Sequence, residues 1–462
     1  MALDNGLSAT ELLEQFDNRN MSAVEYAQDV IAREEAAAYL NAVSHFDSDL
    51  MLCNAQLADE ARKNGKAGAL CGLPVVAKDN INTVSFPTTG GTRALKNNTP
   101  VANAGVVTAI EAAGGYIGGK SGMHELAFGI TSNNAVTGPI RNPHNPDLIP
   151  GGSSGGTASA VGAGIFPVGL GTDTGASVRL PAALCGVVGF RPTVGRYATD
   201  GIIPISQTRD TAGPMAHSVA DIALIDGVLA GQPAATAHKD MSDVVLGLPK
   251  EVFFDDLEDA VEAAVRDALA ELEKAGAKLM DVSVADLMPL NEAVGFPVAL
   301  YEVMRELPEY LAKHAPGVSF KDLVAKIGSP DVAGIIRSQM GDEAMPEAAY
   351  RAAMDEHRPT LQAKYAATFA NHGLTALVFP TSPLCARPIG SDDTVSLNGA
   401  NVPTFPTFIR NTDLGSNIAV PGVSLPCPVS SGLPVGIEFE GLAGGDTDLL
   451  SLAFAVEATL SR

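Results

Sequence analysis

Short apolar runs alternate along the chain with segments in which apolar residues recur every three or four positions. The runs at 73–77, 116–118 and 244–248 predict buried strands, and the spacing within 102–113 and 256–274 predicts amphipathic helices. This alternation is typical of an α/β protein, in which helices cover both faces of a twisted sheet. We expect one large sheet that is mixed but mostly parallel.

The ends of the chain favour helices. Ser8 and Ser22 each stand three residues before a glutamate, a capping box that satisfies free amides in the first helical turn. We also expect a mainly helical stretch at 291–372 and a final helix from about Asp446. The other expectations are strands at 187–190, 279–284, 377–379 and 435–439, a loop-rich segment at 201–215, a polar surface excursion at 229–243, and a long loop at 383–405.

No change of composition divides the chain. We therefore predict one domain over residues 1–462, with three parts. A helical N-terminal segment covers 1–65, a core covers 70–225, and residues 226–462 complete the same sheet and its covering helices.

Composition and charge narrow the classes of function. The net charge of −23 argues against nucleic-acid binding, because phosphate contacts need clustered lysine and arginine. Five cysteines without Cys-x-x-Cys spacing indicate neither a disulfide framework nor a zinc ribbon, and the histidines lack metal-binding spacing. The sequence also has no targeting pattern and no long apolar stretch. We expect a cytoplasmic protein with no membrane contact, no cofactor and no metal.

The densest candidate chemistry lies at 150–181, which contains two glycine-flanked serines, Ser153 and Ser177. Glycines let backbone amides approach a ligand closely, and a helix predicted to begin near Ser177 would add its dipole, so this loop could stabilise an oxyanion. A serine nucleophile also needs a base. Lys78, which ends an apolar run, could serve if burial kept it neutral. Taken singly, the loop also fits a plain turn, and the lysine fits a solvated strand end.

Three other patterns fit their expected context poorly. Gly114 to Ser121 matches a phosphate-binding loop, but a predicted helix precedes it and a predicted strand contains it, the reverse of the required order. Gly151 to Gly155 matches a nucleophile elbow, yet three prolines make 143–150 a poor central strand. His124 is interpreted as a packing or pocket-wall residue.

Three motifs together resemble the amidase signature family. They are Lys78-Asp79, the glycine-serine run 151–156, and 171–181, which occur in the family's order with the two serines 24 positions apart. The resemblance covers nearly the whole chain and implies the amidase signature fold. It also implies a Ser-cisSer-Lys triad: Ser177 as the acyl-forming nucleophile, Ser153 as the bridging serine after a cis peptide bond, and Lys78 as the base.

The resemblance implies further roles around the triad. The family usually has glycine where this chain has Ala176, so alanine either strains the oxyanion loop or narrows the acyl side of the pocket; we favour narrowing. The implied oxyanion hole consists of the amides of Thr174, Gly175, Ala176 and Ser177. The implied substrate contacts include Ala127 and Ser153, and the implied supporting residues are Ser154, Thr172, Asp173 and Arg179. The apolar side chains of Met123 and Phe128 fit either a wall of the substrate pocket or the core.

Segments 123–129 and 195–214 are most similar to the arylacetamide branch of the family, the indoleacetamide and mandelamide hydrolases. This predicts a small primary amide substrate with an apolar or aryl acyl group. Two other activities stay open: a glutamine-hydrolysing amidotransferase A subunit, and a hydrolase of urea-type amides such as biuret derivatives, with Arg209 and Arg305 as candidate polar contacts. A non-catalytic scaffold is a third reading. A homodimer through the N-terminal helices is possible in this fold.

Overall fold

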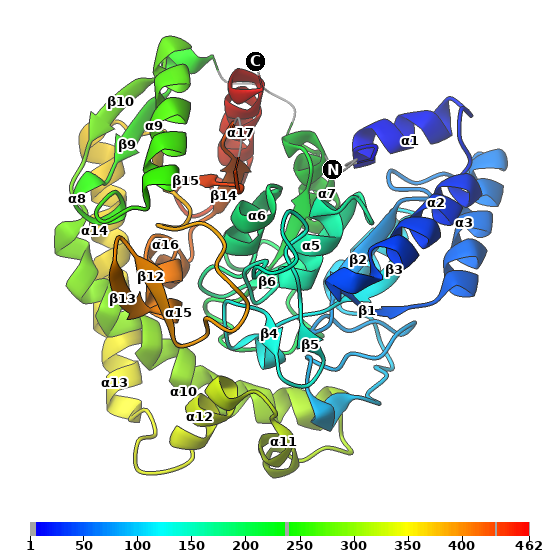
Figure 1. Cartoon of the computed structure of the whole chain (residues 1–462), viewed down its shortest axis with the longest axis horizontal. Coiled ribbons are helices and arrows are strands. Elements are labelled where there is room, and N and C mark those ends of the chain that lie inside the picture. Colours follow the sequence, from blue (N-terminus) through cyan, green and yellow to red (C-terminus); the bar gives the residue numbers. More distant parts are fainter. Residues whose placement is uncertain (1–5, 236–239, 430–431, 462) are drawn as a thin grey trace.

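One eleven-stranded sheet extends across the molecule and is covered by helices (Figure 1). The computed structural model describes residues 6–235, 240–429 and 432–461. In spatial order the strands are β1 (Val43–Phe46), β3 (Tyr116–Ser121), β2 (Pro74–Lys78), β6 (Val168–Asp173), β8 (Thr211–Ala216), β7 (Val188–Arg191), β14 (Gly422–Pro426), β15 (Gly436–Glu440), β11 (Ala376–Pro380), β9 (Val245–Leu248) and β10 (Lys278–Asp281).

The sheet is mixed, as expected, but it is not mostly parallel. Four of its ten strand pairings are parallel and six are antiparallel. Five of the six antiparallel pairings are consecutive and run from β6 through β8, β7, β14 and β15 to β11. In this run β8 lies between β6 and β7. β8 also begins within the segment 201–215, which was predicted to be loop-rich, so that prediction is wrong for residues 211–215.

Helices connect most of the strands, and both predicted capping boxes are present. The predicted long loop at 383–405 is wrong in part, because it contains the hairpin of β12 (Thr394–Leu397) and β13 (Ala400–Pro403). A second small hairpin joins β4 (Asn133–Asn134) and β5 (Gly138–Pro139). The helices are α1 (Ala9–Asp17), α2 (Ala23–Ala36), α3 (Ser48–Lys63), α4 (Gly105–Ala112), α5 (Gly155–Gly162), α6 (Arg179–Cys185), α7 (Val219–Ala230), α8 (Lys250–Phe253), α9 (Asp259–Lys274), α10 (Met288–His314), α11 (Phe320–Lys326), α12 (Pro330–Ser338), α13 (Glu347–Ala352), α14 (Arg358–His372), α15 (Thr404–Ile409), α16 (Asp413–Ile418) and α17 (Asp446–Leu460).

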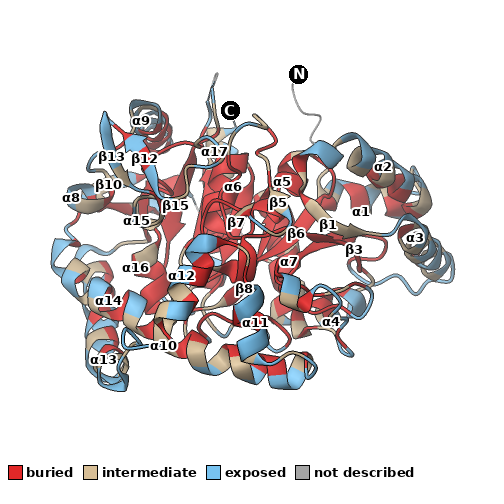
Figure 2. Cartoon of the chain, turned by 60° about the horizontal axis from the view of Figure 1, so that its bottom comes forward, coloured by how far each residue is buried: buried red, intermediate tan, exposed pale blue. Residues whose placement is uncertain are grey.

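The strands at the centre of the sheet are buried on both faces. Every residue of β2, β6, β8 and β15 is buried. Figure 2 shows the buried residues gathered in the strands and on the helix sides turned toward them. Because a buried strand needs no polar face, the alternation predicted for 435–439 does not separate a core side from a solvent side.

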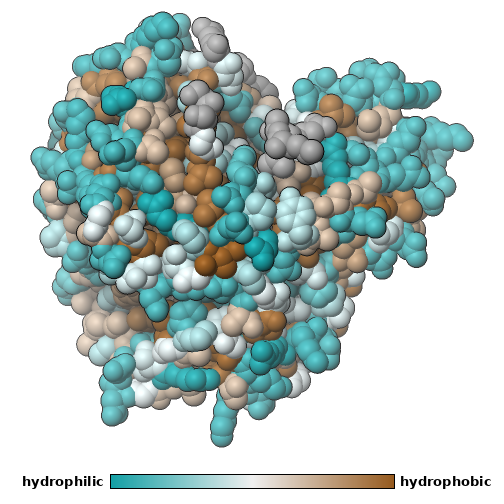
Figure 3. Space-filling view, in the orientation of Figure 1, coloured by the Kyte–Doolittle hydropathy of each residue, from teal (hydrophilic) through white to brown (hydrophobic). Residues whose placement is uncertain are grey.

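The remaining expectations concern surface and ends. Hydrophilic side chains cover most of the face seen in Figure 3. No helix within the described ranges is long and apolar enough to cross a membrane. All five cysteines are free thiols.

The polar surface segment predicted at 229–243 is described only in part, because residues 236–239 lie outside the described residues. Its first two residues, 229 and 230, belong to α7. The prediction of one domain over 1–462 stays a prediction.

Candidate active site

Lys78 is the last residue of β2 and is fully buried. Its Nζ donates to Ser153 Oγ at 2.8 Å and to Thr172 Oγ1 at 2.8 Å. Burial lowers the pKa of Lys78 to about 7, although the charges of Asp173 and Asp210 oppose the shift. A lysine in this state is neutral at moderately alkaline pH and can accept a proton from a hydroxyl.

Ser153 lies in the tight loop before α5. The Gly152–Ser153 peptide bond is cis, as the resemblance implies. A Cβ on Gly152 would come within 3.0 Å of the Ile130 carbonyl carbon, so only glycine fits this close approach. The neighbouring Ser154 hydroxyl donates to the Thr172 carbonyl and accepts from the Thr172 amide, which fixes the loop against β6.

Ser177 stands in the turn between β6 and α6. Its carbonyl accepts the Ser154 amide at 3.3 Å, so the two serine loops are directly joined. The Ser177 hydroxyl makes no hydrogen bond to Ser153 within the part of the chain that the structure describes; the loops meet through backbone, and Lys78 contacts only Ser153 of the two. The helix begins at Arg179, two residues later than predicted, and has seven residues.

A buried group of charges holds this turn. The Asp173 carboxylate accepts the amide of Val178 at 3.0 Å and pairs with Arg179 and Arg191. Burial alone would raise the pKa of Asp173, but the two arginines lower it below its ordinary value. Asp173 and Arg179 belong to the expected supporting set. Arg191 on β7, and Glu438 and Glu440 on β15, which both pair with Arg179, were not anticipated.

The sequence did not indicate that these three charged residues support the turn. Glu438 and Glu440 alternate with apolar residues, a pattern that predicts a solvent-facing side of a strand. Both are fully buried instead, more than 250 positions from the turn that they support.

The turn at 174–177 forms one end of a cavity of about 440 Å³. Ala127 and Phe128 line this cavity as predicted, and Ala176 does as well. Ala176 is not among the residues with positive φ, so the hypothesis that this alanine strains the oxyanion loop is wrong. The opposite walls are mainly apolar and come from α10, α12 and α15, chiefly Phe296, Ala299, Leu300, Ile335, Phe405 and Ile409.

Three residues that were candidates for substrate contact either do not line this cavity or are hydrogen-bonded to other residues. Met123 is fully buried behind the wall, where it packs with Ala127 rather than lining the cavity. Arg209 lines the cavity but donates to Asp413 at 2.8 Å and to the Gly295 carbonyl. Arg305 stacks on Tyr301 and lines neither of the two cavities described here.

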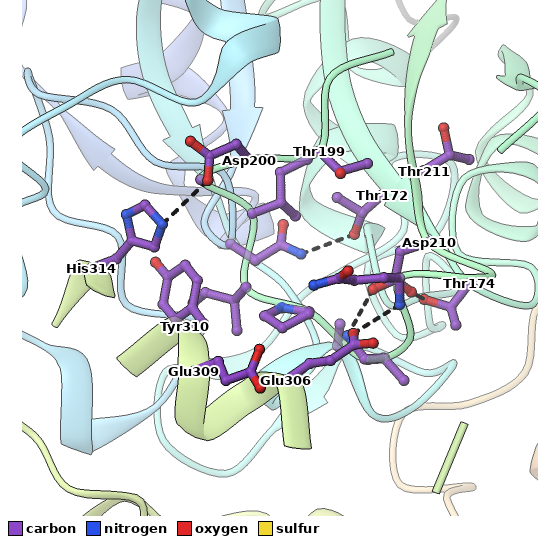
Figure 4. A pocket seen from close by; sticks show the side chains of 18 of the residues that line it. Thr172, Thr174, Thr199, Asp200, Asp210, Thr211, Glu306, Glu309, Tyr310 and His314 are labelled. Atoms are coloured by element: carbon purple, nitrogen blue, oxygen red, sulfur yellow. Dashed lines mark hydrogen bonds and ion pairs between the residues drawn. The ribbon is translucent and has the colours of Figure 1, made fainter. Parts of the chain in front are cut away.

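A second cavity, of about 330 Å³, adjoins the first (Figure 4). Three residues, Ala127, Thr174 and Ile205, line both. Both polar and apolar residues line it, and they include Thr172, whose hydroxyl bonds Lys78. No feature of the sequence indicated it, since its residues come from five separate segments.

The other patterns weighed in the sequence have structural explanations. The phosphate-loop match lies on β3, and its Lys120 is fully buried beside Asp79, at 3.9 Å. His124 is buried and bonds Asp331 through Nε2 at 2.9 Å, while its backbone amide donates to the Ser153 carbonyl. Across the described ranges, no group of histidine, cysteine or acidic side chains is arranged to hold a metal ion.

Comparison with known proteins agrees with this geometry. The family model described as Amidase matches residues 24–450. An indoleacetamide hydrolase of Rhizobium radiobacter is 45% identical over 98% of this chain and 97% of its own, and a mandelamide hydrolase of Pseudomonas putida is 40% identical over 99% and 92%. A solved structure described as an amidase is 31% identical, with a TM-score of 0.87 over 98% of this chain and all of that one. The chain belongs to the amidase signature family and is an amidase, a hydrolase that acts on amide bonds.

Proposed function

We propose that this protein hydrolyses small primary amides with an apolar or aryl acyl group, through an acyl-enzyme on Ser177. One observation carries the proposal: a buried lysine bonded to Ser153 lies behind a turn whose Ser177 opens into a mainly apolar cavity. An aryl ring of a small amide suits such a cavity, since apolar lining favours burial of apolar surface.

The proposed chemistry is a proton relay. Neutral Lys78 draws the proton of Ser153, and Ser153 draws that of Ser177 as its oxygen attacks the amide carbon. The amides of residues 174–177 would stabilise the oxyanion that forms. The relay then gives a proton to the departing ammonia, and water repeats the sequence to release the carboxylic acid.

The cavity favours this substrate class over the two alternatives. Two charged residues line it, Arg209 and Asp413, and they are hydrogen-bonded to each other. Glutamine or a biuret derivative would need free polar partners to compensate for loss of water. The relatives named for indoleacetamide and mandelamide support the same choice. The five free thiols favour a reducing compartment, the cytoplasm.

The test is ammonia release by the isolated chain from phenylacetamide, indoleacetamide, glutamine and biuret. We expect release from the first two only.

Ser177→Ala and Lys78→Met should each lower kcat by about 10⁴- to 10⁶-fold, because Lys78, Ser153 and Ser177 act as a unit.

Lys120→Met is the matched control, a second fully buried lysine at the neighbouring register position. It should keep kcat within about tenfold. Near-normal turnover by folded Ser177→Ala, or glutamine as the preferred substrate, would contradict the proposal.

A further inference from the structure

The second cavity is strongly acidic. Four carboxylates line it, Asp200, Asp210, Glu306 and Glu309, against one lysine, Lys313. Lys313 is already paired with Asp200 at 2.6 Å. Within the described ranges, the other three carboxylates have no cationic group within 4.0 Å. Figure 4 shows Glu306 and Glu309 on one helix, with Asp210 and Asp200 on other segments of the chain.

The inner end of this cavity has an unused hydrogen-bond acceptor. Asn80 lines the cavity, is 1% exposed, and its Oδ1 accepts no hydrogen bond from any described residue. Its Nδ2 donates to Thr172 Oγ1, which in turn bonds Lys78. A buried acceptor without a donor is costly, so this oxygen indicates a ligand that brings an N–H or O–H group.

The position of the cavity relates it to the reacting bond. Ala127, Thr174 and Ile205 separate it from the apolar cavity that we assign to the acyl group. The polar side lies next to Lys78 and its partner Thr172. With its acyl group in the apolar cavity, a substrate would extend its nitrogen substituent past the shared residues Ala127 and Thr174 into the acidic cavity.

We propose that the acidic cavity binds the amine portion of secondary amides whose leaving group carries a second, positively charged amine, so that the protein also hydrolyses this class of amide. The inference rests on the proposed function, because it uses the same Ser177 acyl-enzyme. The bond between acyl carbon and nitrogen breaks, and a bond to Ser177 Oγ forms. The nitrogen leaves with the proton relayed through Ser153. Water then gives the carboxylic acid, and the diamine departs.

The state of Glu306 fits this role. Burial and the nearby charge of Glu302 raise the pKa of Glu306 to about 8, as expected of a carboxyl group that lacks a cationic partner. A bound ammonium group would supply that partner and favour the ionised carboxylate.

The experiment compares two amides of equal length and shape at pH 8, N-(4-aminobutyl)phenylacetamide and the neutral N-pentylphenylacetamide. Wild-type protein should show a kcat/KM about tenfold higher for the charged amide, the size expected of a partly buried charge pair. Glu306→Gln and Glu309→Gln together should bring the ratio near one. Glu292→Gln, an exposed position on the same helix that lines neither cavity, should keep the wild-type ratio.

The outcomes separate this inference from the proposed function. Hydrolysis of phenylacetamide with no turnover of either substituted amide overturns the inference and leaves the proposed function standing. Equal rates for the charged and neutral amides also overturn it, as does an unchanged ratio in the double variant. If phenylacetamide itself is not hydrolysed, both fail.

Discussion

Two fully buried lysines lie on adjoining strands with different surroundings. Ala77 on β2 pairs with Lys120 on β3, so Lys78 and Lys120 occupy successive register positions, and their side chains point to opposite sides of the sheet. Lys120 has Asp79 at 3.9 Å, whereas Lys78 is bonded to two hydroxyls. A buried amine without a carboxylate partner gives up its proton more easily, which suits Lys78 to act as a base.

The state of Lys78 predicts how activity depends on pH. Only the neutral amine can accept the Ser153 proton, and its pKa is about 7. We therefore expect kcat/KM to rise about tenfold per pH unit below pH 7 and to level off above it. The measurement is kcat/KM for phenylacetamide from pH 5 to 9, with circular dichroism to check folding. A profile that is flat down to pH 5 would exclude this assignment of the base.

Ala176 predicts a size effect on the acyl group. Its backbone has no positive φ, and Ala176 is one of the residues that line the apolar cavity. Ala176→Gly should therefore raise kcat/KM for amides with a bulky acyl group more than for acetamide. Steady-state rates on acetamide and 2-naphthylacetamide test this difference. An equal change on both substrates would mean that the methyl group acts on the turn and not on the pocket.

At the scale of elements, the turn between β6 and α6 is fixed at several points. Thr174 donates its hydroxyl to Asp210 at 2.6 Å, and Arg179 donates to the Gly175 carbonyl at 3.1 Å. Asp173 receives the first amides of α6. A turn held in this way keeps its own amides oriented before substrate arrives, which is the condition for oxyanion stabilisation.

The buried charged residues that support this turn should contribute unequally to the stability of the fold. Asp173 is ionised between two arginines, so Asp173→Asn should destabilise the fold by about 3 to 5 kcal/mol and lower kcat. Burial and the charge of Glu438 raise the pKa of Glu440 well above its ordinary value. Ionised Glu440 is thus held less strongly than ionised Asp173, so Glu440→Gln should destabilise the fold less than Asp173→Asn does. Urea unfolding of both variants at pH 7 measures this. Similar losses of stability in the two variants would contradict this ranking.

The motifs that carry chemistry were easier to predict than their support. Lys78, Ser153 and Ser177 stand in short, recognisable runs, and the structure places Lys78 against Ser153 and joins the two serine loops. Glu438 and the residues of the acidic cavity come from segments far apart in the sequence. The pattern of apolar and polar residues in these segments is like that of any other strand, helix or loop. Their proximity depends on strand order, which local spacing does not encode.

For the whole molecule, alternation of helical and strand patterns predicted the layers but not the strand directions. The pattern of a buried strand is the same whichever way the strand runs, so the placement of β8 between β6 and β7 had no local signal. The consequence reaches the site, because β8 and the loop before it supply Asp210 and Thr211 to the acidic cavity.

Burial of Lys78 also couples folding to proton binding. In the unfolded chain this amine keeps its proton up to about pH 10.5, whereas in the folded protein it releases it at about pH 7. Between these values the unfolded state binds one proton more, so the contribution of Lys78 to the free energy of unfolding rises with pH, by about 1.4 kcal/mol per unit at most. Below pH 7 the full cost of the buried charge remains. The residue that we propose as the base thus contributes least to stability at the pH values where we expect the least activity.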